Sequence, residues 1–339
     1  MTMTEEELEF LSDRHSLAVA QACHPPITGR HEVDANTVGM RLDKAAALVF
    51  SEHSRAQLQN WIASGELTVN AQIKKSKYRL SLGDELLLNA SVQEHGDDLP
   101  EDLPIDVVYE DDSVLVVNKP VGMVVHPGAG NWTGTLVNAL LFHYPDFAPL
   151  PRAGLVHRID KDTSGLLMIA KTKYAQQHLT DQLKDKSLYR HYQCVVVGDA
   201  QHLSRHRIID EPIARHPTVR TKMSVQAHGK EAQTHIVTIT KLNECHSLLD
   251  VELKTGRTHQ IRVHLSHIGC PLVGDSLYGS RNQLRASLSP IQRQAIKDFP
   301  RQALHAYELG FLHPKSGQLI KVTVPPPQDM QALINTLKE

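Results

Sequence analysis

The sequence predicts an α+β protein made of two folded domains joined by an acidic linker. The chain has 339 residues, and about 150 residues make a typical domain. Helical and strand-like periodicities both occur, with many short strands and few helices in the longer part. A proline-containing acidic stretch without an apolar face follows residue 91. We therefore expect a flexible acidic extension at 1–38, a small domain at 39–91, a linker at 92–104 and a large domain at 105–339.

The composition is that of an ordinary globular chain. Hydrophobic residues make up 41% and charged residues 22%, which excludes wholesale disorder. The longest unbroken apolar run, 45–50, is far shorter than the roughly 20 residues of a membrane span. The N-terminus is acidic where a secretory signal would be basic and then apolar. We expect a cytoplasmic protein without a membrane partner.

The formal net charge of -2 conceals a strong segregation of charge. Residues 1–38 carry -5 and residues 91–112 carry -9, so the remainder of the chain carries +12. The total alone would argue against a nucleic-acid partner. The two basic bodies between the acidic segments instead favour a polyanionic partner.

The small domain is predicted to contain two helices followed by short strands. Apolar residues at 42, 45, 46 and 49 have helical spacing. Ser54 is a suitable N-cap for a second helix over 55–63, and Gly65 would end it. The order of these elements and the motifs R-L-D, S-R and G-D resemble the S4 RNA-binding fold. That resemblance implies contacts with RNA phosphates by the basic residues Arg41, Lys44, Arg55, Lys74, Lys75 and Lys77.

A buried strand at the start of the large domain leads into a loop rich in proline and glycine. The apolar run 114–117 is followed by Asn118 and Lys119, and then by the loop 120–130. The glycines do not match G-x-G-x-x-G or a phosphate-binding P-loop. We therefore expect no nucleotide cofactor.

The most informative segment is a polar block, residues 157–164, between two apolar strand-like runs. Burying such a block is costly unless its charges have partners or a task. A Ser-His-Asp hydrolase would use Ser164, which lacks the G-x-S-x-G turn. A glycosidase would pair Asp160 with Asp162, but the turn residues that follow argue against a regular strand. A third interpretation is one nucleophilic aspartate held ionised by a cation.

The third interpretation coincides with a resemblance to a known family. The segment His157–Leu166, H-R-I-D-K-D-T-S-G-L, resembles the signature of the RNA pseudouridine synthases with an H-R-L-D catalytic box. Other blocks of that family follow in order, namely N-K-P at 118–120, R-H-Y at 190–192, G-R-T-H-Q-I-R at 256–262, P-L-V-G-D at 271–275 and L-H-A at 304–306. The departure in the box is Ile159 for leucine, which conserves volume.

The resemblance implies a mostly antiparallel sheet with a central cleft, and a redox-neutral isomerisation of uridine that needs no cofactor or metal. Asp160 would be the nucleophile, Arg262 its cationic partner and Tyr192 the residue that stacks on the uracil. Arg158 would enter the space left when the target base is flipped out. The resemblance also implies phosphate contacts by Lys119, Arg257 and Arg281.

Further blocks, including H-P-G-A-G-N at 126–131, resemble the branch of the family that modifies large-subunit ribosomal RNA. They imply action on an intersubunit stem-loop, helix 69, with ribosomal RNA, the large subunit or its assembly intermediate as partner. We expect a monomer.

Two other classes of function compete with this interpretation. The intact Asp160 box argues against a non-catalytic assembly factor. Metal-ligand spacing is missing for a metal-dependent nuclease, and His259, His264 and His267 are expected to be structural.

Overall fold

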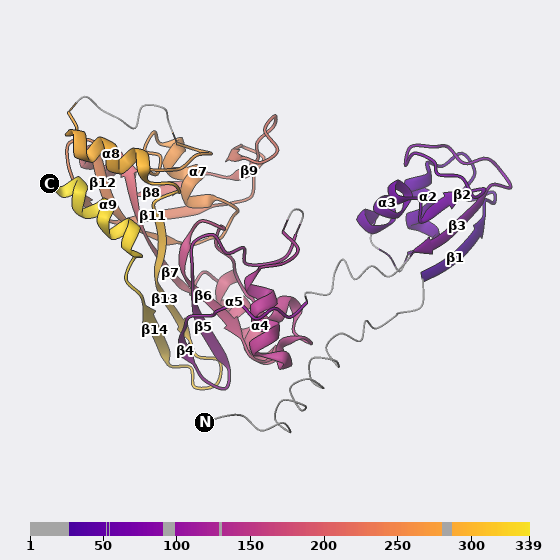
Figure 1. The fold of residues 1–339 in the computed structure, drawn as a ribbon, viewed down its shortest axis with the longest axis horizontal. Helices are drawn as coiled ribbons and strands as arrows, with labels where there is room; N and C mark the ends of the chain where they lie inside the picture. Colours follow the sequence, from indigo (N-terminus) through magenta and orange to yellow (C-terminus); the bar gives the residue numbers. More distant parts are fainter. Residues whose placement is uncertain (1–26, 52, 54, 91–98, 129–130, 280–286) are drawn as a thin grey trace, which may run out of the picture. The chain divides into compact units, whose positions relative to one another are not determined.

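The computed structural model describes residues 27–51, 53, 55–90, 99–128, 131–279 and 287–339. The chain divides into two compact units, 1–97 and 98–339 (Figure 1). Each unit is described by itself.

The described residues of the small unit form a three-stranded antiparallel sheet in the order β1-β3-β2 and two helices. The elements are β1 Ile27–Glu32, α2 Leu42–Val49, α3 Arg55–Ser64, β2 Leu67–Val69 and β3 Glu85–Ala90. Leu42 and Ala45 of α2 pack with Leu58 and Ile62 of α3 against Leu86 of β3, and all five side chains are buried. The helical spacing thus placed both helices correctly, and Gly65 follows α3 with a φ of +86°. Ser54, the expected N-cap, lies outside the described residues.

The small unit begins earlier than the sequence analysis placed it. Strand β1 lies inside the expected extension 1–38, and its six residues pair with β3. The extension boundary at 38 was therefore wrong, because β1 is an edge strand with no fully buried residue and lacks a strong apolar signal. The expected linker was also too long at its far end. The Asn138 side chain donates to the carbonyl of Leu99, and the Glu101 carboxylate accepts from the backbone of Gly134.

The large unit is built around a nine-stranded sheet in the order β4-β5-β6-β13-β7-β12-β11-β8, with β14 paired to β13. Its strands are β4 Val107–Glu110, β5 Val114–Lys119, β6 Ser164–Ala170, β7 Tyr189–Val197, β8 Ile208–Asp210, β11 Gln233–Lys241, β12 His246–Leu253, β13 Leu304–Leu312 and β14 Leu319–Thr323. Neighbouring strands are antiparallel except β6 and β13. This confirms the mixed, mostly antiparallel α+β fold.

Helices cover both faces of this sheet. They are α4 Leu136–His143, α5 Lys173–Lys184, α6 Ala200–Ser204, α7 Gln260–His267, α8 Pro290–Asp298 and α9 Gln328–Lys338. Two 3₁₀ turns lie at Pro145–Phe147 and Pro151–Gly154. Strands β9 Ile213–Arg215 and β10 Met223–Val225 form a separate small hairpin. Leu115 and Val117 of β5 face the core that contains α4 and α7. Val114 and Val116 face the core that contains α5. Covering on both faces explains why this strand is an unbroken apolar run.

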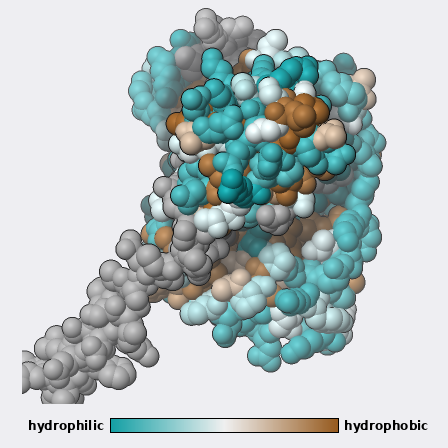
Figure 2. Space-filling view, turned by 90° about the vertical axis from the view of Figure 1, so that its right-hand side faces the viewer, coloured by the Kyte–Doolittle hydropathy of each residue, from teal (hydrophilic) through white to brown (hydrophobic). Residues whose placement is uncertain are grey.

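The surface in Figure 2 is mainly hydrophilic, with apolar groups scattered among polar ones. Within the described part of the chain, no helix combines the length and the apolar character needed to cross a bilayer.

Gly165 permits the parallel contact between β6 and β13. Its φ is +113°, and an added Cβ would lie 2.2 Å from the carbonyl oxygen of Ala306. Gly165→Ala should therefore destabilise the large unit by about 1–3 kcal/mol or more, from backbone strain and the clash. Thermal unfolding measures this effect. The matched control is Gly128→Ala, where no atom lies within 4 Å of the added Cβ; equal melting temperatures for the two variants would contradict the assignment.

Candidate active site

Asp160 lies in the loop that leads into β6, the central strand that pairs with β13. The amide of Thr163 donates to the carbonyl of Asp160, which turns the chain. The carbonyl of Lys161 accepts from the amide of Gly122, so the loop after β5 supports the Asp160 loop. The Asp160 side chain remains 18% exposed. The loop therefore presents the Asp160 carboxylate, partly exposed, just before the N-terminal end of β6.

Lys119 contacts carbonyl groups instead of facing solvent, which corrects its expected role as a phosphate ligand. Its side chain is 1% exposed, and Nζ donates to the carbonyls of Pro120, Met123 and Lys161 at 2.7–2.9 Å. Burial lowers the pKa of Lys119 to about 7, although the charges of Asp162 and Asp160 oppose that shift. Lys119 holds together the two loops that carry the site.

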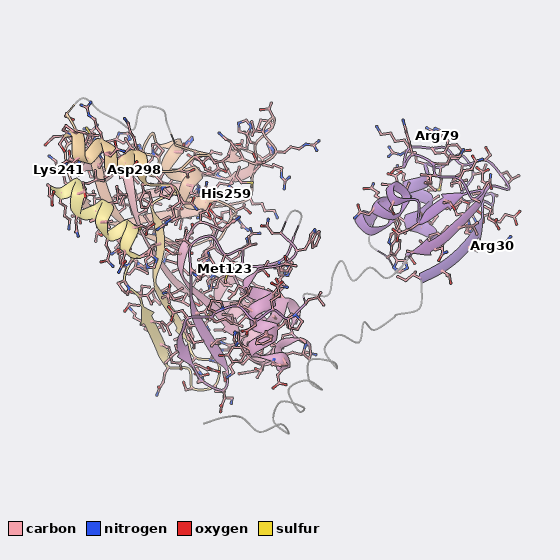
Figure 3. All side chains as sticks on the ribbon, viewed as in Figure 1. Arg30, Arg79, Met123, Lys241, His259 and Asp298 are labelled. Atoms are coloured by element: carbon pink, nitrogen blue, oxygen red, sulfur yellow. The ribbon has the colours of Figure 1, made fainter. Side chains whose placement is uncertain are left out.

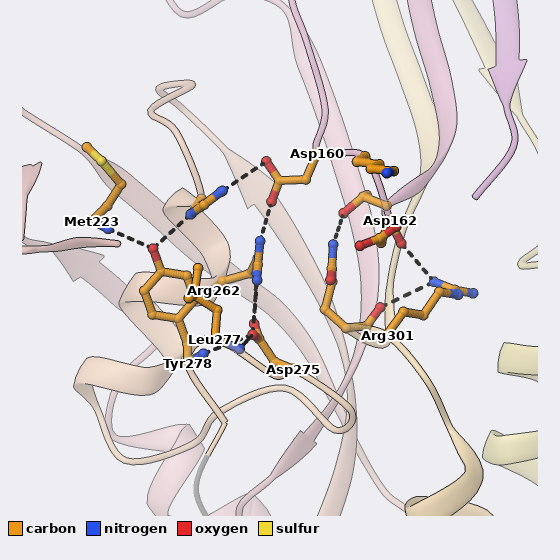
Figure 4. Close-up of polar contacts among 12 residues, drawn as sticks. Asp160, Asp162, Met223, Arg262, Asp275, Leu277, Tyr278 and Arg301 are labelled. Atoms are coloured by element: carbon orange, nitrogen blue, oxygen red, sulfur yellow. Dashed lines mark hydrogen bonds and ion pairs between the residues drawn. The ribbon is translucent and has the colours of Figure 1, made fainter. Parts of the chain in front are cut away.

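Arg262 connects Asp160 to a second carboxylate (Figure 4). Its Nη1 donates to Asp160 at 3.0 Å, while Nε and Nη2 donate to the two oxygens of Asp275 at 2.7 and 3.0 Å. Asp275 also accepts from the amides of Leu277 and Tyr278. Because the guanidinium is held in a fork by Asp275, one of its N–H groups is aimed at Asp160.

The charges in this chain of contacts support one another. Burial opposes the charged form of Arg262, but Asp275 and Asp160 outweigh burial and raise its pKa. Burial likewise opposes ionisation of Asp275, and the contacts with Arg262 and with backbone amides lower its pKa. The site therefore holds a permanent cation beside Asp160.

Tyr278 and His259 form the side of the site next to Arg262. The guanidinium carbon of Arg262 lies 5.0 Å from the centroid of the Tyr278 ring. The Tyr278 hydroxyl accepts from the amide of Met223 and lies 2.8 Å from Nδ1 of His259. Nε2 of His259 is 3.9 Å from Asp160, and Figure 3 places His259 toward the middle of the domain.

His259 therefore lies in the site, whereas the sequence predicted a purely structural role for it. Burial lowers its pKa, although Asp160 opposes that effect. Its φ of +56° at the start of α7 is unusual for a residue other than glycine. His264 does fit the structural interpretation, since it is buried and contacts Thr234 and the carbonyl of Glu211.

A second brace comes from the C-terminal part of the chain. Arg301 binds both oxygens of Asp329, at the start of α9, and donates to the carbonyl of Asp162. The side chain of Gln302 donates to Thr163 at 3.1 Å. The Asp160 loop is thus supported by residues more than a hundred positions further along the chain.

Tyr192 lies on β7 between Val251 of β12 and Ala306 of β13. It is 5% exposed and belongs to the core that also contains Ile159. Burial raises its pKa, with a further increase from the charge of Asp160 and an opposing effect of Arg190. The phenol therefore stays protonated at neutral pH.

Of the other three arginines expected to contact RNA in the large unit, the structure describes two. The exposed residues Arg158 and Arg257 both line one cavity of about 880 Å³. Arg281 lies outside the described residues.

The small unit presents several of its expected contacts to solvent. Lys44, Lys75 and Lys77 are exposed, whereas Lys74 binds Gln72 and lies 5.3 Å from the centroid of the Tyr78 ring. Arg41 donates two hydrogen bonds to Asp43. The side chain of Arg55 lies outside the described part of the chain.

The alternative chemistries receive no support from the geometry. Ser164 is buried and bonds to His305, whose other nitrogen faces the carbonyl of Val324 instead of a carboxylate. Among the described residues there is no group of three or more His, Cys, Asp or Glu side chains that could hold a metal ion.

Comparisons with known proteins agree with this arrangement. Residues 113–267 match the RNA pseudouridylate synthase family, and residues 40–86 match the S4 domain. Ribosomal large subunit pseudouridine synthase D of Escherichia coli (strain K12) is 44% identical over 307 residues, which is 90% of this chain and 93% of that protein. The chain belongs to the RNA pseudouridine synthase family. The Pseudomonas aeruginosa protein of the same name is 44% identical over 91% of this chain and 95% of its own length.

The fold of this synthase also has a relative among solved structures. Human RNA Pseudouridylate Synthase Domain Containing 4 superposes with a TM-score of 0.53. It is 21% identical and covers 69% of this chain and 93% of its own. At this identity the likeness concerns the fold alone.

Three residues of the synthase site were not predicted from the sequence, namely Asp275, Tyr278 and His259. Asp275 was part of the quoted P-L-V-G-D block, but it had no assigned role. A signal was present, because an aspartate that follows an apolar stretch within a family block needs a cationic partner when it is buried. Spacing along the chain could not identify Arg262 as that partner.

Asp275→Asn should slow the synthase by about tenfold to a hundredfold, because Arg262 would lose a charged and bidentate partner. The rate constant under single-turnover conditions should fall more than RNA affinity does. Asp298→Asn on α8 is the matched control, since that exposed carboxylate contacts Gln294 at the surface. Equal rates for Asp275→Asn and the unchanged enzyme would show that Asp275 has no role in the reaction.

Proposed function

We propose that this protein isomerises uridine to pseudouridine at defined positions of large-subunit (23S) ribosomal RNA. The proposed target is the stem-loop called helix 69, with Asp160 as nucleophile. The relatives that support it are named for the large ribosomal subunit and match nine-tenths of the chain. We further propose that the enzyme acts as a monomer in the cytoplasm on ribosomal RNA or an assembly intermediate of the large subunit.

The observation that carries the proposal is the contact of Asp160 with Arg262, which Asp275 fixes from the opposite side. The carboxylate of Asp160 is partly exposed, and its cationic partner lies 3.0 Å away on the protein side. An ionised carboxylate is the form that acts as a nucleophile. The same cation can stabilise charge that develops during the reaction.

The net reaction conserves atoms and electrons. The bond between C1′ and N1 breaks, the uracil turns, and a bond forms between C1′ and C5. The proton on C5 is lost and N1 gains one. Tyr192, a protonated phenol near Asp160, would stack on the uracil, while Arg158 would fill the space that the flipped base vacates.

Asp160→Asn should reduce tritium release from RNA that contains 5-tritiated uridine by three or more orders of magnitude. The assay should contain EDTA and use unmodified large-subunit RNA. Asp162→Asn is the control, because Arg301 binds only its backbone carbonyl; this variant should lose less than about tenfold. No release by the unchanged enzyme would refute the proposed reaction, and an active Asp160→Asn would refute the nucleophile.

The S4 domain is proposed to supply electrostatic RNA affinity through its exposed lysines. Replacing Lys75 and Lys77 with alanine should weaken RNA binding and reduce the slope of log affinity against log salt by about 1.4–1.8. The isomerisation rate at saturating enzyme should change little. The matched control replaces Lys297 and Lys338, two exposed lysines on α8 and α9, with alanine. If both double variants keep the original slope, the S4 lysines are not phosphate contacts.

A further inference from the structure

The cavity of about 880 Å³ beside the Asp160 loop is strongly basic. Seven of its lining residues are arginine or lysine, and Glu231 is the acidic one. Glu231 is already paired with Lys186. Arg158, two positions before Asp160, also lines the cavity and so connects it to the nucleophile loop. The cavity thus has an excess of positive charge next to the reacting centre.

Arg190 is the most deeply buried cation of this lining. It lies on β7, is 5% exposed, and donates from Nη2 to the carbonyl of Leu253 at 3.3 Å. Its Nε has no hydrogen-bond partner within the described part of the chain, and no carboxylate there forms a salt bridge with it. Burial lowers the pKa of Arg190, although the charges of Tyr192 and of the more distant Glu252 oppose that effect. A buried guanidinium without a carboxylate is costly to the fold, so folding alone does not explain it.

His157 is a second buried donor in the same lining. Its Nε2 accepts from the amide of Met168 at 3.1 Å. Burial, and then the charge of Arg190, lower the pKa of His157 to about 3, so the ring is neutral. A neutral ring whose Nε2 accepts must carry its proton on Nδ1. That Nδ1 also has no partner among the described residues, so two buried donors here lack an acceptor.

Gly256 leaves room around the guanidinium. An added Cβ at this position would lie 2.8 Å from Nη1 of Arg190. Gly256 and its neighbour Arg257 both line the cavity. The absence of a side chain at 256 therefore keeps one edge of Arg190 clear, while Arg257 adds a further cation beside it.

We propose that this cavity is a phosphate subsite, in which Arg190 anchors a backbone phosphodiester of the RNA next to the target nucleotide. A phosphate supplies the acceptor oxygens and the negative charge that the lining lacks. Arg257, which lines the same cavity, adds longer-range attraction, whereas Lys254 of the lining is already paired with Glu252. The inference rests on the proposed function for the identity of the ligand as RNA. The role of the subsite is to fix the register of the RNA strand, so that one nucleotide is presented to Asp160.

The test uses chemically made stem-loops of the target RNA in which one phosphate at a time is a neutral methylphosphonate. Binding is measured with the full-length enzyme and with Arg190→Gln. One methylphosphonate position should weaken binding to the unchanged enzyme about tenfold, the usual effect of losing a charged hydrogen bond. Arg190→Gln should weaken binding of the unmodified stem-loop about equally. The two changes combined should cost no more than either alone.

Arg205→Gln is the matched control, because Arg205 is exposed and does not line the cavity. It should leave the methylphosphonate profile unchanged. If the losses from Arg190→Gln and from every methylphosphonate simply multiply, Arg190 touches no phosphate and the proposal is overturned. Since binding does not require isomerisation, an enzyme that fails to release tritium yet shows the coupling would refute the proposed reaction and leave the subsite standing.

Thermal unfolding separates this role from a structural one. Arg190→Gln removes a buried charge without a carboxylate partner, so its melting temperature should stay equal or rise. A lower melting temperature with unchanged RNA affinity would show a structural residue and refute the subsite. Arg190→Lys is the second variant, which keeps the charge but loses the planar fork. It should retain part of the coupling to the same methylphosphonate position.

Discussion

The site depends on the chain of charges from Asp160 through Arg262 to Asp275. Each member is held by the next, and Asp275 is fixed by two backbone amides. Burying any of the three alone would be costly, since an unpaired charge in this environment loses its hydration without compensation. Together they orient the partly exposed carboxylate of Asp160. The loop after β5, the left-handed start of α7 and the turn before β6 all contribute to this placement.

The scaffold explains how such a polar arrangement is tolerated. The Asp160 loop enters β6 at the middle of a sheet that helices cover on both faces. Lys119, buried against three carbonyls, joins the loop after β5 to the Asp160 loop. Polar groups that face inward at this point satisfy backbone acceptors that strand pairing leaves free. Lys119 is thus buried at this point, while the Asp160 carboxylate stays partly exposed.

Local patterns in the sequence predicted individual helices and strands, whereas the mostly antiparallel sheet was expected from the family resemblance. The helix at α2 follows from its apolar spacing, and the unbroken run of β5 follows from burial on both faces. Strand β1 was missed because an edge strand with alternating half-buried residues resembles a polar extension. In the site, the H-R-I-D box predicted a role for Asp160 and a second family block predicted one for Arg262, and the two side chains lie 3.0 Å apart. The positions of Lys119, His259 and Asp275 depended on contacts between distant segments, which spacing along the chain does not encode.

The contact between Arg301 and Asp329 has a consequence for the folding of the large unit. The carbonyl of Asp162 is held by Arg301, and Arg301 is held by Asp329. Without Asp329, the buried guanidinium of Arg301 would lose its bidentate carboxylate partner, which is costly in a buried environment. The Asp160 loop and helix α9 are therefore expected to lose their structure together, as parts of one cooperative unit.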